Sequence, residues 1–253
     1  MIINQIVSGG GGSAPAHYIE KSVDANGKLV NGSTFIDLTG VKSIGNAALY
    51  NAYAYNTSIT SADMSSVEYI TEANACMQTF IGCSNLTSVN VSGIKQISGN
   101  SSCVNMFMYC SKLVSVDFTS LESITSNYFN ESVNSLFGNC NKLETVYLNK
   151  LDTLTGVLTQ SYYPMFGVCP KLKDVYLGGL KSTTFSSAQN QIQYLFDSTT
   201  GSTATGGCTV HFPSNLDPSD PNHTFDASTL TGYPTFGGSS SYIHVAFDLP
   251  ATE

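Results

Sequence analysis

The chain of 253 residues contains no arginine and no tryptophan, and its ten cationic residues are all lysines. Only 11% of the residues are charged, whereas a typical soluble domain has about 25%. The lysines are spread along the chain, and the formal net charge is −8. Nucleic-acid binding needs clustered Lys or Arg to displace counterions, and a membrane-surface helix needs a basic face. The composition therefore excludes both kinds of partner.

Long apolar runs are also missing. No stretch approaches the roughly 18 apolar residues of a membrane span, so we expect no membrane insertion. The segment that follows Met1 lacks the basic and apolar regions of a signal peptide. We therefore expect synthesis and retention in a cytoplasm, unless the protein leaves by assembly or lysis. The seven cysteines are an odd number, and without a secretion signal a disulfide framework is not the default.

Small polar residues are abundant instead. Ser, Thr and Asn number 34, 25 and 20, which is 79 residues together. Hydrophobic residues make up 42% of the chain and aromatic residues 11%, which is enough apolar surface to build a core rather than a disordered chain. The composition thus indicates a folded protein whose surface is covered with hydroxyl and amide groups.

A repeat begins at Phe80 and follows the pattern F-x-x-C-x-x-L-x-x-V-x-φ-x-x-φ-x-x-φ, where φ is apolar. It returns at Phe107, Phe137 and Phe166, in steps of 27, 30 and 29 residues, and a further step of 30 reaches Phe196. With less regular copies on both sides, about seven rungs fit between residues 33 and 213. Because a single unit buries its apolar face only against its neighbours, this periodicity predicts a solenoid.

The apolar period changes within each repeat. Around each Phe, apolar residues occupy the i, i+3, i+4 and i+7 positions of one helix face. In one repeat these are Cys103, Met106, Phe107 and Cys110. After the helix pattern, Val116 and Phe118 alternate with polar residues, as in a strand. We therefore predict an α/β solenoid with a parallel β-sheet on one face and short helices and loops on the other.

The L-x-x-V-x-φ core with its preceding F-x-x-C-x-x-L resembles the leucine-rich repeat, and specifically the BspA-like or Treponema-type subclass. The resemblance covers about 180 residues of the chain. Its repeats are longer than the roughly 23 residues usual for that subclass, and the extra residues, such as 126–131 and 156–161, are expected to form loops on the helix side. The resemblance implies a non-enzymatic interaction protein.

The two ends differ from the repeats in composition. Residues 1–16 include a run of four glycines and read as a flexible arm. Residues 17–32 contain Asn26 and Gly27 between apolar runs, which predicts a hairpin that caps the first rung. The solenoid is expected at 33–213. Residues 214–253 are predicted to form a turn-rich C-terminal cap that ends in a strand at 242–249.

Motifs for metals, cofactors and catalysis are missing or better explained otherwise. The repeated cysteines fall one per rung on an apolar face, where a free Cys behaves as a small hydrophobe; a metal ladder and disulfides are the alternatives. The four histidines have no metal-ligand spacing, and no H-E-x-x-H, G-x-S-x-G or P-loop occurs. Oxygen ligands between Asp217 and Asp226 could bind Ca²⁺, but Asp-Pro is common turn chemistry. We expect no metal and no cofactor.

One outward strand position recurs on every rung and forms the candidate ligand-binding face. Strand alternation places these side chains on the exposed face of the sheet, one above another. They are Asp37, Asp63, Asn90, Asp117, Tyr147, Tyr176 and His211. Flanking columns are mostly Ser and Thr, so this face is acidic toward the N-terminal end and aromatic toward the C-terminal end. Exposed Tyr suits sugars or protein partners; alternatively, Tyr simply favours strands and Asp keeps the sheet soluble.

Three functions follow as hypotheses. The first is a virion-associated protein, on a phage tail or surface, that binds a protein or glycan on a host cell; it is implied by the resemblance to repeat proteins encoded by phages or prophages of gut bacteria. The second is a bacterial surface or secreted BspA-like adhesin. The third is a glycan-acting enzyme, because Asp63 and Asp117 lie two rungs apart, roughly 9.6 Å by strand spacing, within the range for paired carboxylates. An open sheet excludes water poorly, which disfavours an enzyme.

The ends of the chain suggest further contacts. A glycine-rich arm becomes ordered when a partner holds it, so residues 1–20 are predicted to contact other virion proteins. An oligomer or a larger assembly is a related expectation. We expect the protein to be located on the virion; the alternative location is the bacterial cell surface.

Overall fold

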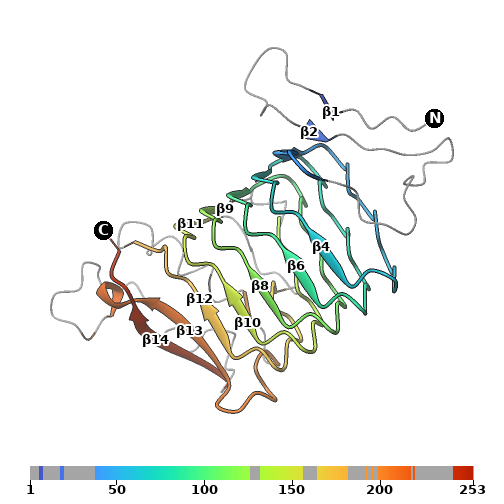
Figure 1. The fold of residues 1–253 in the computed structure, drawn as a ribbon. Helices are drawn as coiled ribbons and strands as arrows, with labels where there is room; N and C mark the ends of the chain where they lie inside the picture. The colour runs from blue at the N-terminus through green and yellow to red at the C-terminus, as the bar shows by residue number, and fades with distance from the viewer. Residues whose placement is uncertain are drawn as a thin grey trace.

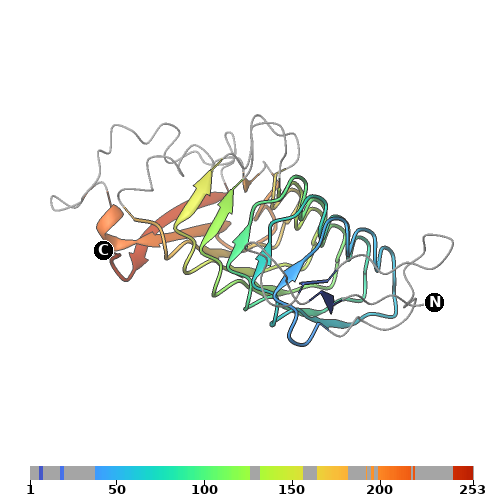
Figure 2. The ribbon, with the colours of Figure 1, turned by 90° about the horizontal axis from the view of Figure 1, so that it is seen from above.

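The structure of the protein is a computed structural model. It describes residues 6–7, 18–19, 38–125, 132–155, 164–181, 192, 195–196, 199–217, 219 and 242–252. Over these ranges the chain winds as a solenoid, and from β4 to β11 each of four repeats contributes one short strand to each of two sheets. Figures 1 and 2 show the rungs stacked side by side from one end of the solenoid to the other.

The front sheet contains seven strands in the order β14-β13-β12-β10-β8-β6-β4. Neighbouring strands are all parallel. Their bounds are β4 Ser61–Asp63, β6 Ser88–Asn90, β8 Ser115–Asp117, β10 Thr145–Tyr147, β12 Asp174–Tyr176, β13 Cys208–Pro213 and β14 Ile243–Leu249. They run across Figure 1 in chain order, from β4 to β14. The predicted solenoid of parallel strands is confirmed.

A second sheet, the side sheet, was not foreseen. Its order is β1-β2-β3-β5-β7-β9-β11, and it too is parallel apart from the antiparallel β1–β2 pair. The bounds are β1 Ile6–Val7, β2 Tyr18–Ile19, β3 Ser43–Ile44, β5 Tyr69–Ile70, β7 Gln96–Ile97, β9 Ser123–Thr125 and β11 Thr153–Thr155. In the side sheet, each of the strands β3, β5, β7, β9 and β11 places one apolar residue of the pattern in the core, for example Ile97 or Leu154.

Turns replace the predicted helices. Residues 73–82, 101–109 and 132–139 are assigned as turns, and no α-helix forms within them. Every second amide in these segments donates to a carbonyl of the next rung, as from Cys76 to Ser102 and from Phe80 to Met106. The amides between them donate three residues back, as from Thr79 to Cys76. We call this layer the turn stack.

The turn stack requires left-handed backbone at every fourth residue. In one rung these residues are Asn74, Gln78 and Gly82, with φ of 53°, 57° and 68°. Its apolar residues therefore recur every four residues, and over seven residues a period of four is nearly the same as the 3.6 of a helix. This similarity explains why the sequence pattern predicted helices.

Stacked aromatic rings fill the centre of the turn stack. Each ring lies 5.4 to 5.7 Å from the next, with interplanar angles between 3° and 28°. The series is Tyr53, Phe80, Phe107, Phe137, Phe166 and Phe196. The repeated Leu, Val and φ positions of the described rungs are buried with these rings in one continuous core.

The cysteines belong to the same core. All seven are free and buried. The thiol of Cys83 donates to the carbonyl of Tyr53 at 3.0 Å, and that of Cys140 donates to the carbonyl of Phe107 at 3.1 Å. Thr200 takes the donor role in a later rung, with its hydroxyl 3.0 Å from the carbonyl of Phe166. Each of these side chains therefore links two rungs in addition to filling space.

The ends bring two further observations. Strand β1 lies within the predicted arm and pairs with β2, which in turn pairs with β3. Of the hairpin predicted at residues 17–32, only β2 lies among the described residues, and loops 126–131 and 156–161 lie outside them. Strand β14 extends the front sheet beyond β13, with a register irregularity between His211 and Pro213. A 3-10 helix, η2 (Ser214–Leu216), follows β13.

Candidate functional site

The outward column is built as one continuous line on the front sheet. Register pairs join Asp63 to Asn90, Asn90 to Asp117 and Asp117 to Tyr147. The line continues from Tyr147 to Tyr176 and from Tyr176 to His211. Six of the seven predicted residues are therefore brought together. Asp37 lies outside the described residues, and the role of the column in binding stays a prediction.

The N-terminal part of the front sheet is hollowed. An open depression of about 490 Å³ is lined by small residues of two strands: Ser61, Ala62, Asp63, Ser88, Val89 and Asn90. The outward residues of both strands are exposed, whereas Ala62 and Val89 point inward. Because the outward side chains of these strands are short and polar, the depression is shallow, and its hydroxyl, amide and carboxylate groups are accessible to a ligand.

The acidic and amide members of the column also have a local structural role. Oδ1 of Asp63 accepts the backbone N–H of Ser65 at 2.9 Å. Oδ1 of Asp117 accepts the N–H of Thr119 at 2.9 Å in the same way. These Asx turns end the strands. The Ser and Thr that follow the column two residues later, such as Ser65 and Thr119, therefore lie in turns, although the sequence placed them in a flanking strand column. The signal for this role was visible as Asp or Asn followed two residues later by Ser or Thr.

The aromatic members form a stack. The rings of Tyr147 and Tyr176 lie 5.1 Å apart at an interplanar angle of 9°. Tyr176 and His211 lie 4.4 Å apart at 11°. Both faces of the Tyr176 ring are therefore covered, and the stack presents mainly ring edges and polar tips to solvent. Burial, with a smaller contribution from the Asp174 carboxylate, raises the pKa of the Tyr176 phenol.

Two carboxylates that sequence reasoning missed hold the imidazole at the end of the stack. Nδ1 of His211 lies 2.9 Å from Oδ1 of Asp248, and Nε2 lies 3.1 Å from Oδ1 of Asp174. Asp174 occupies the flanking column of β12, and Asp248 comes from β14, 37 residues after His211. The Asp174 position was readable from the repeat, whereas Asp248 belongs to a strand outside the repeat pattern.

The charges on the side sheet form ion pairs between rungs. The residue just before each of the strands β3, β5, β7, β9 and β11 is charged: Lys42, Glu68, Lys95, Glu122 and Asp152. Lys181 lies one rung further on and pairs with Asp152 at 3.8 Å. Glu68 lies 2.6 Å from both Lys42 and Lys95, and these two lysines lower the pKa of its carboxyl. Burial opposes the shift. These ion pairs link neighbouring rungs along the surface of the side sheet.

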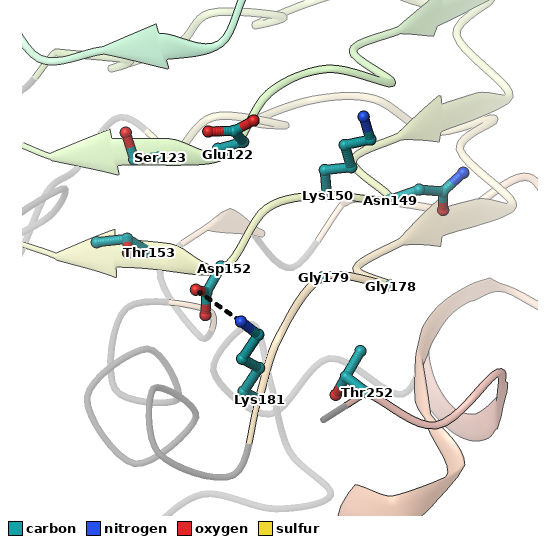
Figure 3. Close-up of a pocket in the computed structure, with 10 residues that line it drawn as sticks. All are labelled: Glu122, Ser123, Asn149, Lys150, Asp152, Thr153, Gly178, Gly179, Lys181 and Thr252. Carbon is teal, nitrogen blue, oxygen red and sulfur yellow. Dashed lines mark ion pairs between the residues drawn. The ribbon is translucent and has the colours of Figure 1, made fainter.

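A second hollow lies beside these ion pairs and is drawn in Figure 3. It has a volume of about 600 Å³ and opens between Glu122, Lys150, Lys181 and Thr252. Gly178 and Gly179 form part of its wall, and at Gly179 a Cβ would collide with the carbonyl carbon of Lys150, so glycine allows the two rungs to approach closely. The Asp152–Lys181 ion pair, at 3.8 Å, crosses its floor. Its walls carry both signs of charge, so it does not select one class of ligand.

No group of three His, Cys, Asp or Glu side chains within the described ranges is placed to hold a metal ion. The described part of the chain contains no helix with the length and hydropathy needed to cross a membrane.

The fold defines this protein as a repeat solenoid of parallel strands. No protein-family model matches the chain, and no curated protein matches it. A solved structure of a leucine-rich repeat protein of T. pallidum is similar to it, with 23% identity and a TM-score of 0.39, over 66% of this chain and 67% of that one.

Proposed function

We propose that this protein is a non-enzymatic interaction protein that binds a host surface ligand, a protein or a glycan, on its front sheet. The observation that carries the proposal is the unbroken column of outward side chains from Asp63 to His211. Solenoids commonly bind partners along such an extended surface rather than in a closed pocket. The open depression over β4 and β6 adds relief to the same face.

Ring spacing supports the choice of this face. Aromatic centroids in the turn stack lie 5.4 to 5.7 Å apart, whereas those on the front sheet lie 5.1 and 4.4 Å apart. The rings at the C-terminal end of the front sheet are therefore packed more closely than those of the core, which gives this end of the face a continuous aromatic surface.

A binding role fits the chemistry of the column better than hydrolysis does. Asp63 and Asp117 each use one carboxylate oxygen to end a strand, and both side chains are exposed on an open sheet. A general acid needs a raised pKa in a site that excludes water. Neither carboxylate lies in such a site.

We propose further that the protein is displayed on a phage virion, on the tail or the particle surface. The support is the resemblance of the repeat to proteins encoded by phages of gut bacteria. Mass spectrometry of purified particles tests this: peptides of the chain should copurify with the tail or capsid proteins. Their absence from the particles, with presence in a cell-envelope fraction, would support a bacterial adhesin instead.

A blocking substitution tests the binding face. Ser88 is exposed in the middle of the depression, so Ser88→Trp should fill it without disturbing the core. Labelled wild-type protein and this variant are compared on a glycan array and on a panel of intact gut bacteria. Ser58→Trp is the matched control, because Ser58 is an exposed serine in a turn outside the sheet. Equal binding by wild type and Ser88→Trp would contradict the proposed face.

A further inference from the structure

The aromatic stack of the front sheet ends in an open ring face. Among the described residues, Tyr176 is stacked on both sides, by Tyr147 and by His211. His211 is followed in register by Ala246 of β14. Tyr147 is stacked on one side, and on its other side the partner in register is Asp117, which carries a carboxylate instead of a ring. Tyr147 is also 36% exposed.

We propose that this step in the column is a subsite for an arginine side chain of a protein ligand. The guanidinium group would lie on the open face of Tyr147 and pair with the carboxylate of Asp117. This inference rests on the proposed function, since it assigns a chemical class to the ligand of the front sheet. It favours a protein segment over a glycan, because sugars stack on exposed ring faces, and two of the three rings in the stack offer none.

The chemistry of the two side chains matches a planar cation. An aromatic ring attracts a cation to its face through its quadrupole, and arginine also stacks on the ring. The carboxylate of Asp117 is exposed, and its Oδ1 is bonded to the N–H of Thr119 at 2.9 Å. A guanidinium donates two parallel hydrogen bonds to a carboxylate while its plane stays free to stack on a ring. A lysine ammonium is a compact point charge and has no plane to stack.

The charge of the surrounding face is complementary. Strands β4 to β14 of the front sheet carry four acidic side chains, Asp63, Asp117, Asp174 and Asp248, and these strand residues include no lysine. Lys112 and Lys142 precede their strands, at the end opposite to the Asp63–Asp117 line, whereas the exposed Lys150 follows β10 by three residues. The strand residues of the front sheet therefore carry acidic side chains and no lysine, and they attract a basic segment.

The composition of the chain narrows the source of the cation. Because the sequence has no arginine, a second copy of the protein has no guanidinium to offer, and the ligand must be another protein. Beyond Asp117 the column continues through Asn90 into the depression over β4 and β6. The backbone of a bound segment can thus extend from the Tyr147 subsite into a surface lined with hydrogen-bonding groups.

The test uses the full chain and a defined probe. The probe is an acetylated and amidated Gly-Arg-Gly-Arg-Gly peptide, and its counterpart carries citrulline, which keeps the shape of arginine and removes the charge. Binding is measured by titration calorimetry and by ¹⁵N shifts at low salt. We expect the arginine peptide to bind more tightly than the citrulline peptide and to shift the amides around Asp117 and Tyr147.

Matched variants separate the subsite from general charge attraction. Asp117→Asn and Tyr147→Leu should each weaken binding of the arginine peptide by about threefold to tenfold. Asp117→Asn keeps the strand-ending turn, since Asn90 accepts the N–H of Ser92 in the rung before. Asp217→Asn is the control, because Asp217 has the same turn role with Ser219 and the same change in charge.

For the aromatic residue the control is Tyr109→Leu, which alters an exposed tyrosine of the turn stack. Equal affinity for both peptides, or equal weakening by Asp117→Asn and Asp217→Asn, would overturn the arginine subsite. The proposed function has a separate readout. If Ser88→Trp still reduces binding to the array or the cells, the front sheet remains the ligand face and only the arginine assignment fails.

Discussion

The thiol Sγ of Cys110 lies 3.2 Å from the carbonyl oxygen of Phe80, one rung earlier in the solenoid. The thiol is a donor between rungs and is buried, so burial raises its pKa and the nucleophilic thiolate is suppressed. Burial also raises the pKa of Cys83 to about 11. We expect none of the seven cysteines to react with a thiol reagent at about pH 8 in the folded protein, and all of them after unfolding. Rapid labelling of the folded protein would contradict this arrangement.

The ring column should carry much of the stability. Phe107 is buried and stacks at 5.6 Å on both Phe80 and Phe137. Phe107→Ala should lower the free energy of unfolding by about 3–5 kcal/mol, because it leaves a cavity and removes two stacked pairs. Phe107→Leu fills most of the space and should cost less. Urea unfolding measures both; equal losses would mean that stacking rather than volume decides.

The charge ladder of the side sheet predicts a dependence on pH. Lys42 and Lys95 lower the pKa of Glu68 below its usual value of 4.5. The stabilisation is therefore fully present above about pH 4.5 and is lost as the pH falls through the lower, folded-state value. Glu68→Gln should be less stable than wild type at neutral pH, and the difference should shrink at about pH 3. Chemical unfolding at several pH values checks this, and a difference independent of pH would contradict it.

Strand β14 should depend on the contact between His211 and Asp248. Nδ1 of His211 lies 2.9 Å from Oδ1 of Asp248, which joins the strand to its neighbour β13 through side chains. Asp248→Ala should speed amide hydrogen exchange in β14 and leave the turn stack unchanged. Asp217→Asn, a charge change away from this contact, serves as the control. Unchanged exchange in β14 would mean that its backbone pairing with β13 is sufficient.

Much of the solenoid was predictable from the repeat. Strand alternation placed Val116 inward and Asp117 outward, and the structure agrees, with Val116 buried and Asp117 exposed. The step between repeats placed Tyr147 and Tyr176 in one column, and they are register partners. These inferences succeed because side-chain direction in a strand has a period of two, and stacking copies that period from rung to rung.

The helix prediction was wrong for a physical reason. The apolar residues Cys103, Met106, Phe107 and Cys110 fit a helix face, yet their backbone lies in turns that bond to the next rung. An isolated repeat gives no information on that choice, because the carbonyls that accept the amides belong to another repeat. The left-handed residues in the turns, such as Asn105 at φ 55°, are sustained by those bonds between rungs.

By itself, the sequence determined the rung spacing, the buried Phe, Cys, Leu and Val positions, and the exposed column on the front sheet. Only the tertiary structure decided that the rings of Tyr147, Tyr176 and His211 lie face to face and that Asp174 and Asp248 hold the imidazole. The physical reason is the range of the interactions. Periodicity records which face a residue occupies, whereas ring orientation and the pairing of β13 with β14 depend on atoms brought together from distant parts of the chain.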